Sequence, residues 1–209
     1  MRSERFGQNR NGGRNFSVFV LSAALLLTAC DEKTEGPAPS RFASVKKNTQ
    51  AASQAFCDKS YPAIGAASKR FVPAATRPFG AQTPKPKGWT WLNVWATWCK
   101  PCVEEMGVLN RWREAFTRES LPIGFELLSI DETSAQPALE EWSAKNLPGP
   151  IKWIKSEDDF GPFLDGIGVE RTAAIPIHVL IDPKGMVRCV RVGAIHEQNY
   201  GSVRDLIAE

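Results

Sequence analysis

The sequence is poor in the side chains that bind metal ions, because its 209 residues include only two histidines and five cysteines. A structural zinc site usually needs four Cys or His ligands. Apart from Cys30 and the pair Cys99 and Cys102, the remaining cysteines are Cys57 and Cys189, which are too far apart in sequence to form a second ligand pair. We therefore expect no metal site and no cofactor.

The sequence also lacks a strong excess of charge of one sign. It has 26 Lys and Arg residues against 23 Asp and Glu residues, a net charge of +3. The first 29 residues contain four arginines and one acidic residue, Glu4, so the rest of the chain is neutral. A neutral domain offers no electrostatic attraction for nucleic acid, and we expect no nucleic-acid partner.

The apolar stretch near the N-terminus is short. Residues 16–29 are mostly apolar, but these 14 positions fall short of the roughly 20 that span a bilayer. Arginines precede the stretch and small residues end it, which is typical of a signal peptide. We expect residues 1–29 to be removed, and the alternative is a permanent membrane helix.

The end of that stretch, Leu27 to Cys30, reads LTAC and resembles the bacterial lipobox, in which the cysteine is lipidated and becomes the first residue. The resemblance implies a membrane anchor at Cys30, which several acyl chains would make stable. Asp31 follows, and in lipoproteins of enterobacterial type this residue favours the inner membrane. Residues 30–54 are rich in Lys, Ser, Thr, Ala and Pro, so we expect a flexible tether.

Residues 55–209 are expected to form one α/β domain. Trp89 to Thr97 is a run of aromatic and branched residues typical of a strand buried on both faces. Pro101 suits the first turn of a helix, which we predict over residues 101–117 after a loop at 77–88. Further strands are predicted at 123–130, 151–154, 177–181 and 186–192, and further helices at 137–145, 160–167 and 198–208. This order indicates an α/β sandwich with a mixed central sheet flanked by helices.

The segment Trp95 to Cys102, WATWCKPC, carries two thiols three positions apart at the predicted junction of strand and helix. A thiolate just before a helix is stabilised by the N–H groups and the dipole of the first turn. We therefore assign Cys99 as the nucleophile and Cys102, one turn further along, as the resolving thiol. The predicted chemistry is thiol/disulfide exchange through a redox-active disulfide.

These residues resemble the thioredoxin superfamily and, within it, the membrane-tethered TlpA/ResA/CcmG-like thiol:disulfide oxidoreductases. The resemblance runs from about Trp89 to Glu209 and includes the sequence AIP that ends at Pro176. It implies a thioredoxin-like sandwich and a cis peptide bond at Pro176 facing the dithiol. It also implies backbone contacts between Ile175 and a bound peptide. Asn93 stands where this branch commonly has asparagine and thioredoxins themselves usually have aspartate.

Glu105, three residues after Cys102, matches an acidic residue that this branch uses to move a proton to or from the resolving thiol. The alternative is a solvated glutamate that only favours the helix N-terminus. Neither His178, expected on a core strand, nor His196, expected in a loop, is a strong functional candidate.

Two readings of Cys57 and Cys189 stay open. They are either joined in a structural disulfide, as is common in an oxidising compartment, or are two separate buried thiols. Sequence alone does not place their Cα atoms within bonding range of one another.

The function implied by the resemblance is a lipid-anchored oxidoreductase of the periplasm or extracytoplasmic space that reduces protein disulfides, as in cytochrome c maturation or metal-site assembly. The implied partners are a protein disulfide substrate and a membrane thiol transporter that donates electrons, and we expect a monomer. Two alternatives stay open. A disulfide oxidase or isomerase uses the same residues, and a copper-binding module would use Cys99, Cys102 and His178 as ligands.

Overall fold

The computed structural model describes residues 55–81, 84 and 86–208. The expected signal peptide (1–29), the lipidation site Cys30 and the tether (30–54) lie outside these residues. Within them, no helix has both the length and the apolar character that crossing a membrane requires.

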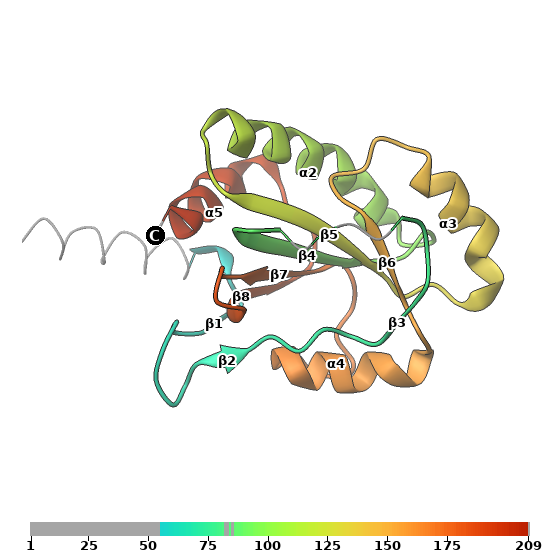
Figure 1. The fold of residues 1–209 in the computed structure, drawn as a ribbon, viewed down its shortest axis with the longest axis horizontal. Helices are drawn as coiled ribbons and strands as arrows, with labels where there is room; N and C mark the ends of the chain where they lie inside the picture. Colours follow the sequence, from blue (N-terminus) through green and yellow to red (C-terminus); the bar gives the residue numbers. More distant parts are fainter. Residues whose placement is uncertain (1–54, 82–83, 85, 209) are drawn as a thin grey trace, which may run out of the picture. The chain divides into compact units, whose positions relative to one another are not determined.

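A mixed eight-stranded sheet forms the centre of the domain (Figure 1). Its strands are β1 (Lys59–Ser60), β2 (Lys69–Arg70), β3 (Thr76–Arg77), β4 (Trp89–Trp95), β5 (Ile123–Ser129), β6 (Ile151–Ile154), β7 (Ile177–Ile181) and β8 (Met186–Val192). The order is β1-β8-β7-β4-β5-β6-β3, and β2 also pairs with β8. Strands β4, β5 and β6 are parallel, whereas β7 is antiparallel to both β4 and β8.

Helices cover both faces of this sheet. They are α2 (Lys100–Arg118), α3 (Gln136–Ser143), α4 (Phe160–Ile167) and α5 (Tyr200–Ile207), and the short 3-10 turns η1 (Thr133–Ala135), η2 (Glu157–Asp159) and η3 (Glu197–Asn199) come just before the last three. Helices α2 and α5 lie on one side of the sheet and α4 on the other (Figure 1). The predicted α/β sandwich with a mixed sheet is confirmed.

All seven residues of strand β4 are buried, as are all five of its neighbour β7. Trp91 stacks on Phe125 of β5 with ring centroids 5.4 Å apart, and its edge packs against Trp112 of α2 at 5.6 Å. Trp95 packs in the same way against Trp142 of α3. Burial on both faces removes the alternation of polar and apolar residues, which explains why this strand is a continuous apolar run in the sequence.

The segment before β4 contributes to the sheet, which the sequence did not predict. Strands β1 and β2 pair with β8, and β3 pairs with β6 at the opposite edge. Arg77 was expected to begin a loop, but it lies in β3, where its Nε donates a hydrogen bond to the carbonyl oxygen of Ile154. Strands of two residues are too short to show a periodic pattern, so this error has a simple cause.

The other predicted elements are present. Strands β6, β7 and β8 and helix α4 have the predicted bounds, and the remaining ends differ by one or two residues. The largest change is at the last helix, because residues 197–199 form the 3-10 turn η3 and α5 begins only at Tyr200.

Candidate redox site

The two cysteines of the CxxC sequence lie where β4 gives way to α2. Cys99 is the N-cap residue of α2, and Pro101 lies in the first turn of that helix. The two cysteines form a disulfide, and both are buried, with 5% of Cys99 and none of Cys102 exposed. The backbone N–H of Cys102 donates a hydrogen bond to Sγ of Cys99, 3.3 Å away. The helix N-terminus therefore provides the amide contact that a thiolate at Cys99 requires.

The chain that leads into β7 faces this disulfide. The Ile175–Pro176 peptide bond is cis. The carbonyl oxygen of Ile175 lies 3.9 Å from Sγ of Cys99. Ile175 and Trp98, the latter 66% exposed, help to line a shallow depression of about 390 Å³ beside the disulfide. Trp98 and Ile175 thus border a surface beside Cys99 that could receive an extended peptide.

Glu105 is buried on the sheet-facing side of α2, and the alternative of a solvated glutamate is therefore wrong. Only 1% of its side chain is exposed. The amide Nδ2 of Asn93 donates to Oε1 at 2.8 Å, and the backbone N–H of Ile195 donates to Oε2 at 3.1 Å. These donors offset part of the free-energy cost of burying a carboxyl group.

Sequence reasoning placed His178 at the site only in the copper-binding alternative and did not anticipate its contact with Glu105. His178 lies on the core strand β7, as expected, but its ring is fully buried with Nε2 at 3.4 Å from Oε2 of Glu105. Strand pairing sets it opposite Asn93 of β4. The available signal was that each of these polar residues interrupts an otherwise apolar core strand, where a buried polar group needs a partner.

The site has no nearby metal-binding cluster in the part of the chain that the structure describes, where no three His, Cys, Asp or Glu side chains are placed to hold an ion. The ligand set of the copper alternative, Cys99, Cys102 and His178, is not brought together as such a cluster.

The charged residues next to the cysteines on α2 are on the surface. The side chain of Lys100 is 85% exposed, and its Nζ lies 3.8 Å from a carboxylate oxygen of Glu104, which is 65% exposed. An exposed pair of this kind contributes little free energy. Neither residue reaches the buried side of the disulfide, where Glu105 lies.

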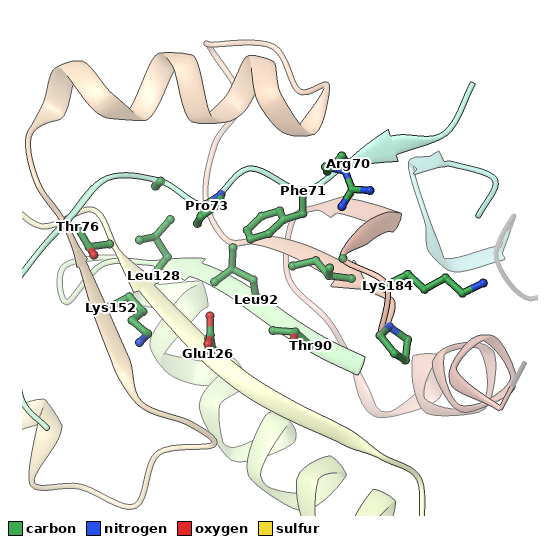
Figure 2. Close-up of a pocket in the computed structure, with 14 residues that line it drawn as sticks. Arg70, Phe71, Pro73, Thr76, Thr90, Leu92, Glu126, Leu128, Lys152 and Lys184 are labelled. Carbon is green, nitrogen blue, oxygen red and sulfur yellow. The ribbon is translucent and has the colours of Figure 1, made fainter. Parts of the chain in front are cut away.

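A separate pocket of about 520 Å³ lies elsewhere on the domain (Figure 2). Its floor includes Thr90 and Leu92, which alternate along β4 with the residues that face α2. Phe71, from the segment between β2 and β3, covers it and packs edge-on against Phe163 of α4. This pocket contains neither cysteine, so it is distinct from the redox site.

No family model matches the chain. Among proteins of known name, the thiol-disulfide oxidoreductase ResA of Bacillus anthracis is 28% identical over 135 residues, covering 63% of this chain and 71% of that protein. ResA of Geobacillus thermodenitrificans is 25% identical over 147 residues, covering 69% and 78%. These similarities coincide with a Cys99–Cys102 disulfide at a helix N-terminus. The chain is thus similar to ResA-like thiol-disulfide oxidoreductases, and its fold is like that of the thioredoxin superfamily.

These relatives, together with the Cys99–Cys102 disulfide of the CxxC sequence, indicate a thiol-disulfide oxidoreductase. The thiol:disulfide interchange protein DsbE of Haemophilus influenzae is 28% identical over 107 residues, and the match spans 51% of this chain and about half, 52%, of that relative. The solution structure of a thiol:disulfide interchange protein from Bacteroides sp. superimposes with a TM-score of 0.50 at 17% identity, over 68% of this chain and 90% of the other. That likeness shows the thioredoxin-like fold.

Proposed function

We propose that this oxidoreductase reduces protein disulfides, with Cys99 as nucleophile and Cys102 as resolving thiol. The supporting observation is the charge around the disulfide. Glu105 lies buried one turn after Cys102, while Lys100 points into solvent and pairs with Glu104. A dithiol is a strong oxidant when its thiolate form is stabilised, and a buried carboxylate does the opposite because it repels that thiolate. This environment favours the disulfide form of the protein and therefore a reductant.

The exchange proceeds in two steps. The thiolate of Cys99 attacks one sulfur of the substrate disulfide, which forms a mixed disulfide and releases the other substrate sulfur as a thiolate. Cys102 then gives its proton to Glu105 and attacks Sγ of Cys99. The Cys99–Cys102 bond forms, the second substrate sulfur leaves with its electron pair, and the substrate has gained two electrons. Glu105 acts as the proton acceptor because it is the buried carboxylate on the same face of α2.

The cis-Pro segment supplies the place for the substrate. The backbone of Ile175 borders Cys99 and would pair with an extended peptide as an added strand does, while exposed Trp98 offers apolar surface beside it. This geometry favours a protein segment that contains cysteine, as in an apocytochrome c or a metal-site protein. A membrane thiol transporter would return the Cys99–Cys102 disulfide to the dithiol.

The second disulfide supports a location outside the cytoplasm. Cys57 and Cys189 are bonded, with Cα atoms 5.4 Å apart, and such structural disulfides persist in oxidising compartments. In this proposal, residues 1–29 are a signal peptide, and Cys30 carries the lipid that holds the protein at the inner membrane. A flexible tether over residues 30–54 would extend roughly 25 to 30 Å, which lets the monomeric domain reach its partners.

The reduction potential of the Cys99–Cys102 pair tests the direction of electron flow. The full chain is equilibrated with thiol buffers of known potential, and alkylation followed by mass spectrometry counts the two thiols separately from Cys57 and Cys189. We expect a value at or below about −220 mV, in the range of cellular reductants. A value near about −120 mV, typical of a strong oxidant, would overturn the proposal.

The anchor is tested by a Cys30→Ala variant of the full chain in a bacterial host. We expect the unchanged protein to be recovered with the membrane fraction and the variant to be absent from it. Recovery of the variant in the membrane fraction at the unchanged level would overturn lipidation at Cys30.

A further inference from the structure

His178 is held from both sides of its imidazole ring. On one side, Nε1 of Trp91 and Nδ2 of Asn93 each lie 3.2 Å from Nδ1. On the other side, Nε2 lies 3.4 Å from Oε2 of Glu105. The ring is fully buried in β7. Nδ1 is hydrogen-bonded there, whereas Nε2 is in contact with Glu105 without hydrogen-bond geometry.

The contact with Trp91 determines which ring nitrogen carries the proton. An indole N–H group can only donate a hydrogen bond, so Nδ1 of His178 must accept it and has no proton of its own. A neutral imidazole has one N–H group, and it is therefore Nε2–H. Oε2 of Glu105 lies 3.4 Å from Nε2, close enough for a small rotation of the carboxylate to form a hydrogen bond with this group. The amide of Asn93 fits the same assignment, because it also donates to Oε1 of Glu105.

The charged groups that face His178 come from two elements. Glu105 approaches from α2, and Arg191 of β8 lies opposite His178 in the strand pairing. The guanidinium of Arg191 is engaged by Phe56, since it donates to the Phe56 carbonyl oxygen at 2.9 Å and lies over the phenyl ring. Glu105 is therefore the charged group that Nε2 contacts.

We propose that His178 is a positioning residue for the resolving step, and that its Nε2–H group holds the carboxylate of Glu105 in the orientation that accepts the proton of Cys102. This inference rests on the proposed function of Glu105. Asn93 and Ile195 donate hydrogen bonds to the two carboxylate oxygens, and Nε2 of His178 lies 3.4 Å from one of them. These neighbours favour the carboxylate as an acceptor and restrict its rotation.

Cys102 is a neighbour of Glu105 on α2. It lies three residues before Glu105 on the buried face of α2, and side chains at this spacing are neighbours on a helix. When Cys102 attacks the mixed disulfide at Cys99, its proton passes to Glu105, the Cys99–Cys102 bond forms and the substrate sulfur leaves with its electron pair. His178 keeps its own proton throughout. Its removal would leave Glu105 free to turn away from Cys102.

The resolving step can be observed with dithiobis(nitrobenzoate), an aromatic disulfide, and the full chain reduced at Cys99 and Cys102. Attack by Cys99 releases the first coloured thiolate, and attack by Cys102 on the resulting mixed disulfide releases the second. In His178→Leu we expect the second release to slow by about tenfold at pH 7 and the first to stay within about twofold. Glu105→Gln should slow the second release at least as much, and combining both changes should slow it no further.

His178→Gln separates positioning from proton transfer by His178 itself. Glutamine offers an amide NH₂ donor and a carbonyl acceptor but does not titrate, so we expect its second release to stay within about threefold of the unchanged protein across the pH profile. His196→Gln, at the other histidine, is the matched control, because that side chain is exposed and the substitution leaves the backbone N–H of its neighbour Ile195 in place. A second release at the unchanged rate in His178→Leu would overturn the proposal. So would a His178→Gln variant as slow as His178→Leu.

A measurement on the unchanged protein tests the proposal even if these variants misfold. Nitrogen NMR of the two imidazole rings, assigned with His196→Gln, should show His178 as the Nε2–H tautomer at neutral pH. An Nδ1–H tautomer or an imidazolium would overturn the proposal. A reduction potential typical of an oxidant would instead overturn the proposed direction of electron flow and leave these two release steps as described.

Discussion

Asn93 of β4 and Glu105 of α2 are joined by a buried hydrogen bond of 2.8 Å between Nδ2 and Oε1. The bond connects the central strand of the sheet to the helix that carries both cysteines. It also explains why an amide suits position 93, since a carboxylate there would face a second carboxylate. Whether residue 93 carries an amide or a carboxyl group therefore determines if Glu105 is the single carboxyl group of this contact or one of two.

Asn93→Asp places two carboxyl groups within hydrogen-bonding distance in a buried site. At pH 7 we expect the free energy of unfolding to fall by about 2 to 3 kcal/mol, because a donor is lost and like charges repel. The loss should shrink toward about pH 4, where one carboxyl group takes up a proton and can donate to the other. Urea unfolding at both pH values measures this, and equal stability of variant and unchanged protein at pH 7 would contradict it.

The Cys57–Cys189 disulfide closes a loop between residues 132 positions apart and fastens the segment before β1 to β8. Replacing both cysteines by alanine should lower the free energy of unfolding by about 4 to 5 kcal/mol, mainly because the unfolded chain gains freedom. Urea unfolding with the Cys99–Cys102 pair oxidised in both proteins gives the comparison. A difference below about 1 kcal/mol would show that this bridge does not hold the domain together.

Tyr200 provides a test at alkaline pH. Burial, together with the hydrogen bond that its hydroxyl donates to Glu119, raises the pKa of Tyr200 to about 12, and burial also raises the pKa of Tyr61. The unfolded chain loses these protons near pH 10, so this contribution to stability is complete below about pH 10 and is lost as the pH rises toward about 12. Absorbance of tyrosinate in the folded protein should stay low at pH 10. Ionisation of both tyrosines at that pH would contradict these environments.

Several features of the fold could be predicted from the sequence because each carries a strong local signal. The aromatic run of β4 and the proline in the first turn of α2 indicated the central strand and the helix that carries the cysteines. The strands before β4 were missed because two-residue strands have no period and depend on pairing with β6 and β8. Edge strands of this kind are determined by tertiary contacts, which a single sequence does not display.

The site was predictable only where residue type and spacing decide the chemistry. Cys99 and Cys102 meet that condition, because the pair and the helix start are adjacent in sequence. The burial of Glu105 does not, since a glutamate near the start of a helix has the same local signal whether it faces solvent or the sheet. The contact between Glu105 and His178 joins residues far apart in sequence. It depends on the register that sets His178 opposite Asn93 and on the packing of α2 against these strands.

The assignment of Cys99 as nucleophile and Cys102 as resolving thiol is tested most directly by trapping the mixed disulfide. The Cys102→Ser variant of the full chain, expressed in a bacterial host, lacks the resolving thiol and should stay bonded to a partner through Cys99. Mass spectrometry of the adduct should locate the bond at Cys99, and a reducing agent should release the partner. Adducts that form instead through Cys102 in a Cys99→Ser variant, with none in Cys102→Ser, would contradict the account.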